Sequence, residues 1–142
     1  MLTSSALIKF CATGKSGLGH LRRSTNIAAA IRATAPEQKL ALVTNAPVAG
    51  LSPSELALFD EIVCVSREAM AGVLSEMETG PVVIDTAAIE DVGFLPDPLC
   101  LVLRETAAEK LSDFRLFNGR MWDRVIVPSP LAHWLPPAQE IG

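Results

Sequence analysis

The sequence predicts an α/β fold in which an open parallel sheet of about six strands carries helices on both faces. Its 142 residues are 49% hydrophobic and 20% charged, which fits one domain with a well-buried core and excludes a disordered chain. Six short apolar runs are continuous rather than alternating, as in strands that are covered on both faces. Helical patterns lie between most of these runs, and this alternation is typical of a doubly wound, Rossmann-like fold.

The apolar runs define the expected strands. They span residues 7–12, 40–44, 62–65, 82–85, 100–103 and 125–127.

The first expected helix follows the first strand and runs from residue 19 to 35. Its predicted packed face has helical spacing and consists of Ser24, Ile27, Ala28, Ile31 and Ala35. A second helix begins after Ser52, because Ser52, Pro53 and Glu55 have the order of an N-cap, a first-position proline and a capping box.

Two further helices are expected between the later strands. The third carries an apolar stripe at i, i+3, i+4 and i+7, formed by Met70, Val73, Leu74 and Met77, and Gly80 with Pro81 ends it. The fourth begins at a capping box that spans residues 106–109, and it reaches about Asn118 and Gly119.

The domain organisation follows from where the prolines lie. Residues 1–128 are expected to form the Rossmann-like domain, and residues 129–142 a proline-rich tail or the start of an interdomain linker. Trp134 and Leu135 are large apolar residues in this tail. They are expected either to cover an edge of the domain or to dock against a partner.

Composition also limits the partners and the location of the protein. The net charge of −4 argues against nucleic acid as a partner. Cys11, Cys64 and Cys100 are expected to be buried thiols in a reducing compartment, since their number is odd and their spacing suits no zinc site. No segment is long and apolar enough to cross a membrane, and the first residues lack the pattern of a signal peptide. We therefore expect a cytoplasmic protein without a metal or other cofactor.

The turn between the first strand and the first helix is rich in glycine and basic residues. Gly14 and Lys15 fit neither the P-loop spacing, which requires a glycine where Lys9 stands, nor the dinucleotide fingerprint G-x-G-x-x-G. The turn can still bind an anion, because glycines allow close backbone approach and helix N-termini attract negative charge. The residues expected to face this anion or an acceptor are Gly14, Lys15, Ser16, Gly17, Gly19 and Arg23.

His20 is the strongest catalytic candidate in the sequence. It continues the predicted packed face of the first helix into its first turn, so its ring is expected to face the crevice at the sheet edge. A neutral imidazole there can act as a general base. The alternative is a histidine that only packs and forms hydrogen bonds within the first turn.

Polar residues at the carboxyl ends of other predicted strands are expected to reach the same edge of the sheet. They are Asn45, Asp85, Thr86, Arg104 and Glu105. Asp85 is the strongest of these candidates, either as a partner for Arg23 or as an acceptor for a sugar hydroxyl. It can equally be a cap for the next turn, and Arg104 and Glu105 can equally form a local ion pair.

The segment "GLGHLRRSTNIAAAIRA" resembles the first strand–turn–helix unit of MurG-like glycosyltransferases of the GT-B fold, in which a G-x-G-H turn follows the first strand. It is also similar to MurG-like nucleotide-sugar hydrolases, which carry G-x-G-H-x-x-R. Later segments "PVVIDT", "LCLVLRET" and "DRVIVPSP" look like the closing strands of the same N-terminal domain. The resemblance covers most of the chain, but only the opening motif is specific.

This resemblance implies that the chain is an N-terminal, acceptor-binding domain. His20 would deprotonate an acceptor hydroxyl, or a water molecule in the hydrolase, and the amides of Gly17 and Gly19 would face the acceptor or the donor diphosphate. The nucleotide-sugar donor would bind to a C-terminal domain or a separate subunit, so the chain is not expected to catalyse transfer alone. A different class remains open: a non-catalytic module that binds an anion at the turn and a partner through the tail around Trp134.

Overall fold

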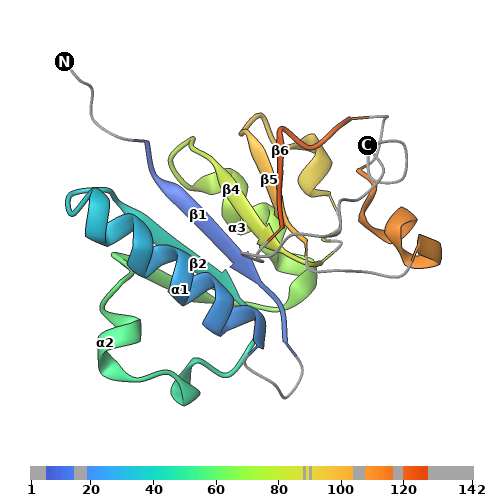
Figure 1. Ribbon diagram of the computed structural model, residues 1–142. Helices are drawn as coiled ribbons and strands as arrows, with labels where there is room; N and C mark the ends of the chain where they lie inside the picture. Colours follow the sequence, from blue (N-terminus) through green and yellow to red (C-terminus); the bar gives the residue numbers. More distant parts are fainter. Residues whose placement is uncertain are drawn as a thin grey trace.

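The computed structural model describes residues 6–14, 19–87, 89, 91–103, 108–116 and 120–127. It confirms the predicted α/β fold: a six-stranded open sheet in the order β3-β2-β1-β4-β5-β6, with every neighbouring pair parallel (Figure 1). The strands are β1 (Ile8–Ala12), β2 (Leu40–Thr44), β3 (Glu61–Cys64), β4 (Val82–Asp85), β5 (Leu99–Val102) and β6 (Arg124–Ile126). Each coincides with an expected apolar run to within one residue at either end.

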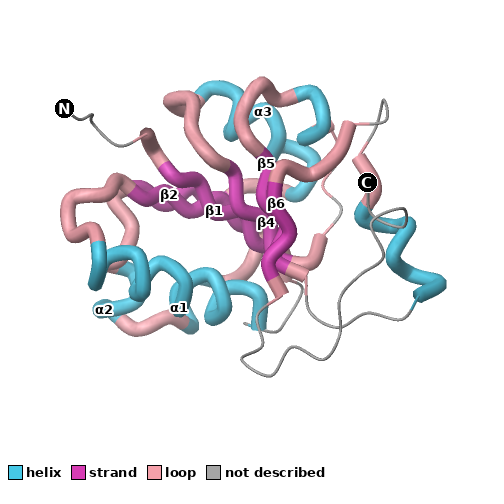
Figure 2. Tube along the Cα trace, turned by 45° about the horizontal axis from the view of Figure 1, so that its top comes forward, coloured by secondary structure: helices cyan, strands magenta, loops and turns pink. Residues whose placement is uncertain are grey.

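The helices lie on both faces of this sheet. Helix α1 (Gly19–Thr34) and the single-turn α2 (Pro53–Leu56) cover one face, and α3 (Met70–Glu76) covers the other (Figures 1 and 2). Short 3-10 helices connect these elements: η1 (Val48–Gly50), η2 (Arg67–Ala69), η3 (Val92–Phe94) and η4 (Ala108–Phe114). This arrangement follows from right-handed crossovers, which change face where the strand order reverses between β3 and β4.

The side chains of the central strands alternate between two apolar clusters. Phe10 on β1 packs with Leu21, Leu40 and Leu42 on the side of α1, whereas Cys11 packs with Met70 and Leu74 of α3. Both β1 side chains are fully buried. Burial on both faces explains why the strands are continuous apolar runs in the sequence.

Helix α1 packs through a different stripe from the predicted one. Its buried residues are Leu21, Ser24, Thr25 and Ala28. Ser24 and Ala28 were expected there, but Ile27 and Ile31 are only half-buried and Ala35 is exposed. The helix is rotated so that small side chains approach the sheet and the two isoleucines lie at the side of the contact, a choice that spacing alone does not determine.

The other helices agree with the sequence to different degrees. The capping box of α2 is confirmed, because Ser52 accepts a hydrogen bond from the Glu55 amide and the Glu55 side chain accepts one from the Ser52 amide. The expected fourth helix is a 3-10 helix within its described part, where Leu111 is the fully buried anchor. One buried position does not provide the apolar stripe that a longer α-helix needs. Residues 106, 107 and 117–119 of that expected helix lie outside the described residues.

The cysteines are free, but they are not all buried. Cys11 is buried and desolvation raises the pKa of its thiol to about 12, whereas Cys64 is exposed and Cys100 is half-buried. The expectation of a buried Cys64 was wrong because β3 is an edge strand that the short α2 leaves largely uncovered. Within the described residues, no helix combines the length and the apolar character needed to cross a bilayer.

A buried ion pair lies at the amino edge of the sheet, which is the edge where the parallel strands begin. Lys9 of β1 is completely buried, and its Nζ donates to Asp97 Oδ2 at 2.7 Å and to the carbonyl of Leu74 at 3.4 Å. The same carboxylate oxygen accepts the Gly80 amide at 2.9 Å. Burial raises the pKa of Asp97, but the hydrogen bonds from Lys9 and Gly80 outweigh it and hold that pKa below its ordinary value. The pair therefore links β1 to the segments that precede β4 and β5.

Candidate functional site

The candidate site lies at the carboxyl edge of the sheet, where α1 begins beside the end of β4. Neighbouring β1 and β4 are parallel, so their carboxyl ends meet at one edge. His20, in the first turn of α1, places its Nδ1 atom 2.7 Å from Oδ1 of Asp85, the last residue of β4. These residues are 65 positions apart in the chain. The fold therefore brings together two of the candidates that the sequence suggested.

Asp85 binds a second basic side chain from the same helix. Arg23 donates from Nε to Asp85 Oδ2 at 2.6 Å, so the two carboxylate oxygens hold one basic residue each. The Asp85 side chain is 2% exposed, while those of His20 and Arg23 are 31% and 26% exposed. The carboxylate is thus inside the protein and its partners extend from it towards the surface. A pairing with Arg23 was one of the two roles expected for Asp85.

The contact with Asp85 determines what the His20 ring can do. A carboxylate oxygen only accepts hydrogen bonds, so Nδ1 must carry the proton in this contact. In the neutral ring the lone pair then lies on Nε2, the nitrogen that takes a proton in general-base catalysis. The partial exposure of the ring leaves His20 accessible to a small molecule. A histidine held in this way can accept a proton and has a carboxylate to stabilise the resulting cation.

Asn45, at the end of β2, positions the chain where it leaves β1. Its Oδ1 accepts a hydrogen bond from the Gly14 amide at 3.0 Å. This contact brings Gly14 and Asn45 together at the carboxyl edge, where both were expected. Lys15, Ser16 and Gly17 lie outside the described residues.

Thr86 turns the chain at the end of β4 and connects it to β5. Its backbone has a φ of 40°, and both its amide and its hydroxyl donate to the carbonyl of Val102, at 2.7 and 2.9 Å. Positive φ is uncommon for a β-branched residue, so these two bonds hold an unfavourable backbone conformation beside Asp85. Arg104 and Glu105, the candidates after β5, lie outside the described residues.

A wide-open groove of about 800 Å³ lies beside one face of α1 near the same site, and every described residue that lines it belongs to that helix. Gly19 lies at its start, and a Cβ atom at that position would meet no atom of the described residues within 4 Å. The groove is lined by Gly19, Arg22, Arg23, Asn26, Ile27, Ala30, Ile31 and Thr34. Its polar half adjoins His20 and Asp85 through Arg23, and its apolar half follows the helix away from them.

Sequence reasoning did not identify the contact between His20 and Asp85 or the place of Asn26 in the groove. The contact between His20 and Asp85 could have been suspected, because both residues were assigned to the same sheet edge. The place of Asn26 could also have been suspected, because it lies three positions after Arg23 on the same side of a helix. Among the described residues, no group of three or more histidine, cysteine, aspartate or glutamate side chains could hold a metal ion.

Comparison with known proteins does not assign the chain to a family. No protein-family model, curated protein or solved structure matches the chain. Conclusions about its function therefore depend on the site itself.

Proposed function

We propose that the chain is the acceptor-binding half of a GT-B-type glycosyltransferase, in which His20 acts as the general base. The observation that carries this proposal is the 2.7 Å contact between His20 Nδ1 and the buried Asp85 carboxylate at the carboxyl edge of the sheet. In open α/β sheets this edge is where ligands bind. The resemblance of the turn before His20 to MurG-like enzymes supports the same role.

In this mechanism His20 Nε2 takes the proton from an acceptor hydroxyl. The oxygen forms a bond to the anomeric carbon of the nucleotide-sugar, and the bond from that carbon to the nucleotide phosphate breaks. Asp85 orients the ring and stabilises its cationic form, as a carboxylate does in other catalytic histidine pairs. Arg23 holds the second carboxylate oxygen and so fixes the orientation of Asp85. The donor would bind to a second domain or subunit.

The same residues suit hydrolysis if water replaces the acceptor. His20 would then deprotonate the water, and the product would be a free sugar rather than a glycoside. The products distinguish the two reactions, whereas the roles of His20 and Asp85 are the same in both. The proposal includes a cytoplasmic location, because thiols such as Cys64 remain free in reducing compartments.

The test measures turnover by the protein in its longest natural form. The protein is incubated with a panel of nucleotide-sugars, with and without candidate hydroxyl acceptors, and released nucleotide and sugar products are quantified. His20→Ala should lower turnover by ~10²–10⁴, the usual contribution of a general base. Near-normal turnover in this variant would contradict the role of His20.

A matched control is available at the other end of α1. Asp60 accepts a hydrogen bond from Arg32 at 2.8 Å and another from the Leu40 amide at 2.9 Å, so it pairs with an α1 arginine as Asp85 does. Asp60→Asn weakens such a pair without touching the candidate site, and turnover should be retained. If the protein binds anions but turns over no donor, with or without acceptors, the chain is a binding module and not part of an enzyme.

A further inference from the structure

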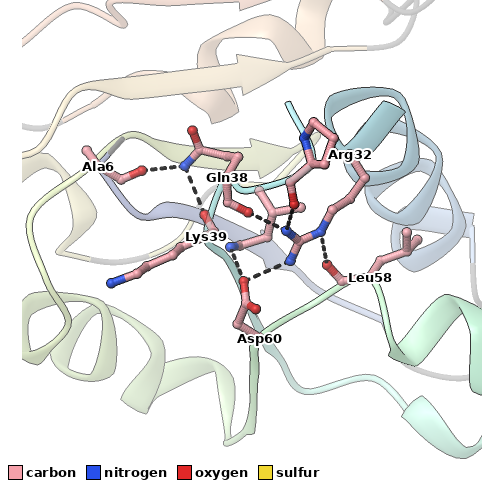
Figure 3. Close-up of polar contacts among 8 residues, drawn as sticks. Ala6, Arg32, Gln38, Lys39, Leu58 and Asp60 are labelled. Atoms are coloured by element: carbon pink, nitrogen blue, oxygen red, sulfur yellow. Dashed lines mark hydrogen bonds and ion pairs between the residues drawn. The ribbon is translucent and has the colours of Figure 1, made fainter. Parts of the chain in front are cut away.

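In the part of the chain that the structure describes, the carboxylates that bind a basic side chain are, with one exception, also held by a backbone amide. Asp60 is an example, since its Oδ2 accepts the Leu40 amide at 2.9 Å together with Arg32 at 2.8 Å. Figure 3 shows the Arg32 guanidinium pointing towards this carboxylate. The other such pairs of carboxylate and amide are Asp97 with Gly80, Asp123 with Leu99, and Glu55 with Ser52.

Asp85 is the exception. Its two oxygens accept hydrogen bonds from His20 Nδ1 and Arg23 Nε, and no backbone amide of the described residues donates to them. A backbone amide in a folded chain has a fixed position, whereas a long side chain can turn about several bonds. The position of the Asp85 carboxylate therefore depends more strongly on where the main chain places the end of β4.

Thr86, the next residue, anchors this end of the strand. Its amide donates to the carbonyl of Val102 at 2.7 Å, and its hydroxyl donates to the same oxygen at 2.9 Å. Val102 is the β5 residue that lies opposite Asp85 in the register of the two strands. Asp85 thus lies between the paired part of β4 and a neighbour that is bound twice to β5.

This anchor requires an unfavourable backbone conformation. Thr86 has a φ of 40°, which β-branched residues rarely adopt. Such conformations persist only where the surrounding structure enforces them, and they concentrate at functional sites. Asp91, the other described non-glycine residue with a positive φ, is exposed and belongs to a residue type that tolerates this region. Among the described residues, the strained choice of side chain therefore occurs next to Asp85.

We propose that Thr86 is a positioning residue, which holds the Asp85 carboxylate where it can bind His20 and Arg23 at once; this inference rests on the proposed function of His20. Glycine would adopt the same φ without strain, but it has no hydroxyl that could bind Val102. The hydroxyl is what threonine adds at this position. Without it the end of β4 can move, and Asp85 no longer fixes the orientation of the His20 ring.

The first measurement determines which nitrogen of the His20 ring carries the proton. In alkaline buffer, where the ring is neutral, ¹⁵N NMR of the full chain distinguishes the two tautomers, and His20→Asn assigns the signals by their loss. The contact with Asp85 should keep the proton on Nδ1 in the unmodified protein. Thr86→Gly should shift the population towards Nε2, and Thr86→Ser, which keeps the hydroxyl, should restore Nδ1.

The second measurement compares stability with turnover in the same variants. The midpoint of denaturant unfolding should change little in Thr86→Gly, because the relief of backbone strain offsets the lost hydrogen bond. With the substrates used for His20→Ala, kcat should fall by about 10- to 100-fold and KM should change little, as when a catalytic group loses its supporting contact. Thr86→Ser should recover most of this loss. A purely structural role predicts the reverse, a lower midpoint with the tautomer unchanged.

Asp91→Gly is the matched control. It places glycine at the other described position of positive φ, where the aspartate side chain forms no capping hydrogen bond with η3. The tautomer and kcat should both stay as in the unmodified protein. The proposal is overturned by an unchanged tautomer in Thr86→Gly, by an equal effect of Asp91→Gly, or by a failure of Thr86→Ser to restore Nδ1. It is also overturned if the unmodified protein carries the ring proton on Nε2.

The roles of Thr86 and His20 can fail separately. The tautomer measurement needs no substrate, so it tests Thr86 even in a chain without activity. If the tautomer depends on Thr86 but His20→Ala keeps normal turnover, the general base is wrong and Thr86 still positions the pair of His20 and Asp85. If His20→Ala abolishes turnover while Thr86→Gly keeps both the tautomer and kcat, the role of Thr86 is wrong and the general base stands.

Discussion

A buried aspartate binds basic side chains at the amino edge of the sheet, where the strands begin, and another does so at the carboxyl edge, where they end. The two sites differ in how exposed these basic partners are. The side chains of Asp97 at the amino edge and Asp85 at the carboxyl edge are 3% and 2% exposed. The closest cationic contact of each carboxylate is nearly identical, 2.7 Å to Lys9 and 2.6 Å to Arg23. Burial and ion pairing of the carboxylate therefore do not distinguish a structural site from a candidate functional one.

The partners make the difference. Lys9 is completely buried, and the Gly80 amide, which also donates to the Asp97 carboxylate, is buried too, so neither of these two partners is open to a ligand. His20 and Arg23 keep 31% and 26% of their side chains exposed. A buried carboxylate with exposed partners can orient groups that still react or bind, whereas one with buried partners can only hold the chain together.

The largest effect is expected when the carboxylate of the amino edge is removed. Asp97→Ala leaves the Lys9 ammonium buried without its partner, and such a loss costs about 3–5 kcal/mol of unfolding free energy. Urea or guanidinium unfolding monitored by circular dichroism measures it. The double variant Lys9→Met/Asp97→Leu removes both charges and should recover most of the lost stability. If the double variant were as unstable as Asp97→Ala, an unpaired charge would not be the cause.

Gly80 should be the next most sensitive position at this edge. A Cβ atom there would lie 1.9 Å from the carbonyl oxygen of Leu7, which is backbone and cannot turn aside. Gly80→Ala should therefore destabilise the protein by about 1–3 kcal/mol or more, as overpacking does. The midpoint of denaturant unfolding measures the change. A fully stable Gly80→Ala protein would mean that the start of β1 can move away from this contact.

Acid should weaken the amino edge through Asp97. Its pKa is held below the ordinary value by Lys9 and Gly80, so the folded state binds this proton less readily than the unfolded chain does. The resulting stabilisation is complete above about pH 4–5 and is lost as the pH falls through the folded pKa. Asp97→Asn should flatten the fall in unfolding free energy between about pH 5 and pH 2.5. If the dependence of unfolding free energy on pH were the same in Asp97→Asn, the acid sensitivity would come from other carboxylates, such as Asp60.

Substitution at the carboxyl edge should affect activity more than stability. Asp85→Asn preserves shape, and His20 and Arg23 can turn towards water, so the expected loss of stability is about 1 kcal/mol. Turnover should fall by about 10²-fold or more, because asparagine has one acceptor oxygen for the two donors of His20 and Arg23 and no negative charge to stabilise the cationic ring. Paired measurements of denaturant unfolding and product formation test both halves. A stability loss equal to that of Asp97→Ala would remove the distinction between the edges.

Local patterns in the sequence were sufficient for the six strands, for the first three helices and for the list of candidate residues, but not for the expected fourth helix, which is a 3-10 helix within its described part. The capping box at Ser52 and the continuous apolar strands depend on neighbouring residues, and the structure reproduces them. Asp85 was identified because it ends a strand. The rotation of α1 was not predictable in this way, because Ile27 and Ala28 both fit helical spacing and only the sheet decides which of them is buried.

The pairings depend on the topology and could not be read from the sequence. Lys9 and Asp97 are 88 positions apart and belong to the first and fifth strand regions. A lysine inside an apolar strand needs a buried partner, but this signal was not used in the sequence analysis and does not by itself identify Asp97. The contact of His20 with Asp85 has the same origin, since it requires β4 to lie next to β1. Strand order therefore determined what composition and spacing left open.

The smallest effect is expected at the glycine of the open edge, which is the counterpart of Gly80. A Cβ at Gly19 would meet no atom of the described residues within 4 Å, so Gly19→Ala should change the unfolding free energy by no more than about 1 kcal/mol and in the stabilising direction. Turnover should be more sensitive than stability, because the added methyl group lies next to His20 at the start of α1. We expect Gly19→Ala to keep its unfolding midpoint while turnover falls. If stability drops and turnover persists, the start of α1 is packed rather than open, and the contrast between the two edges does not hold at this position.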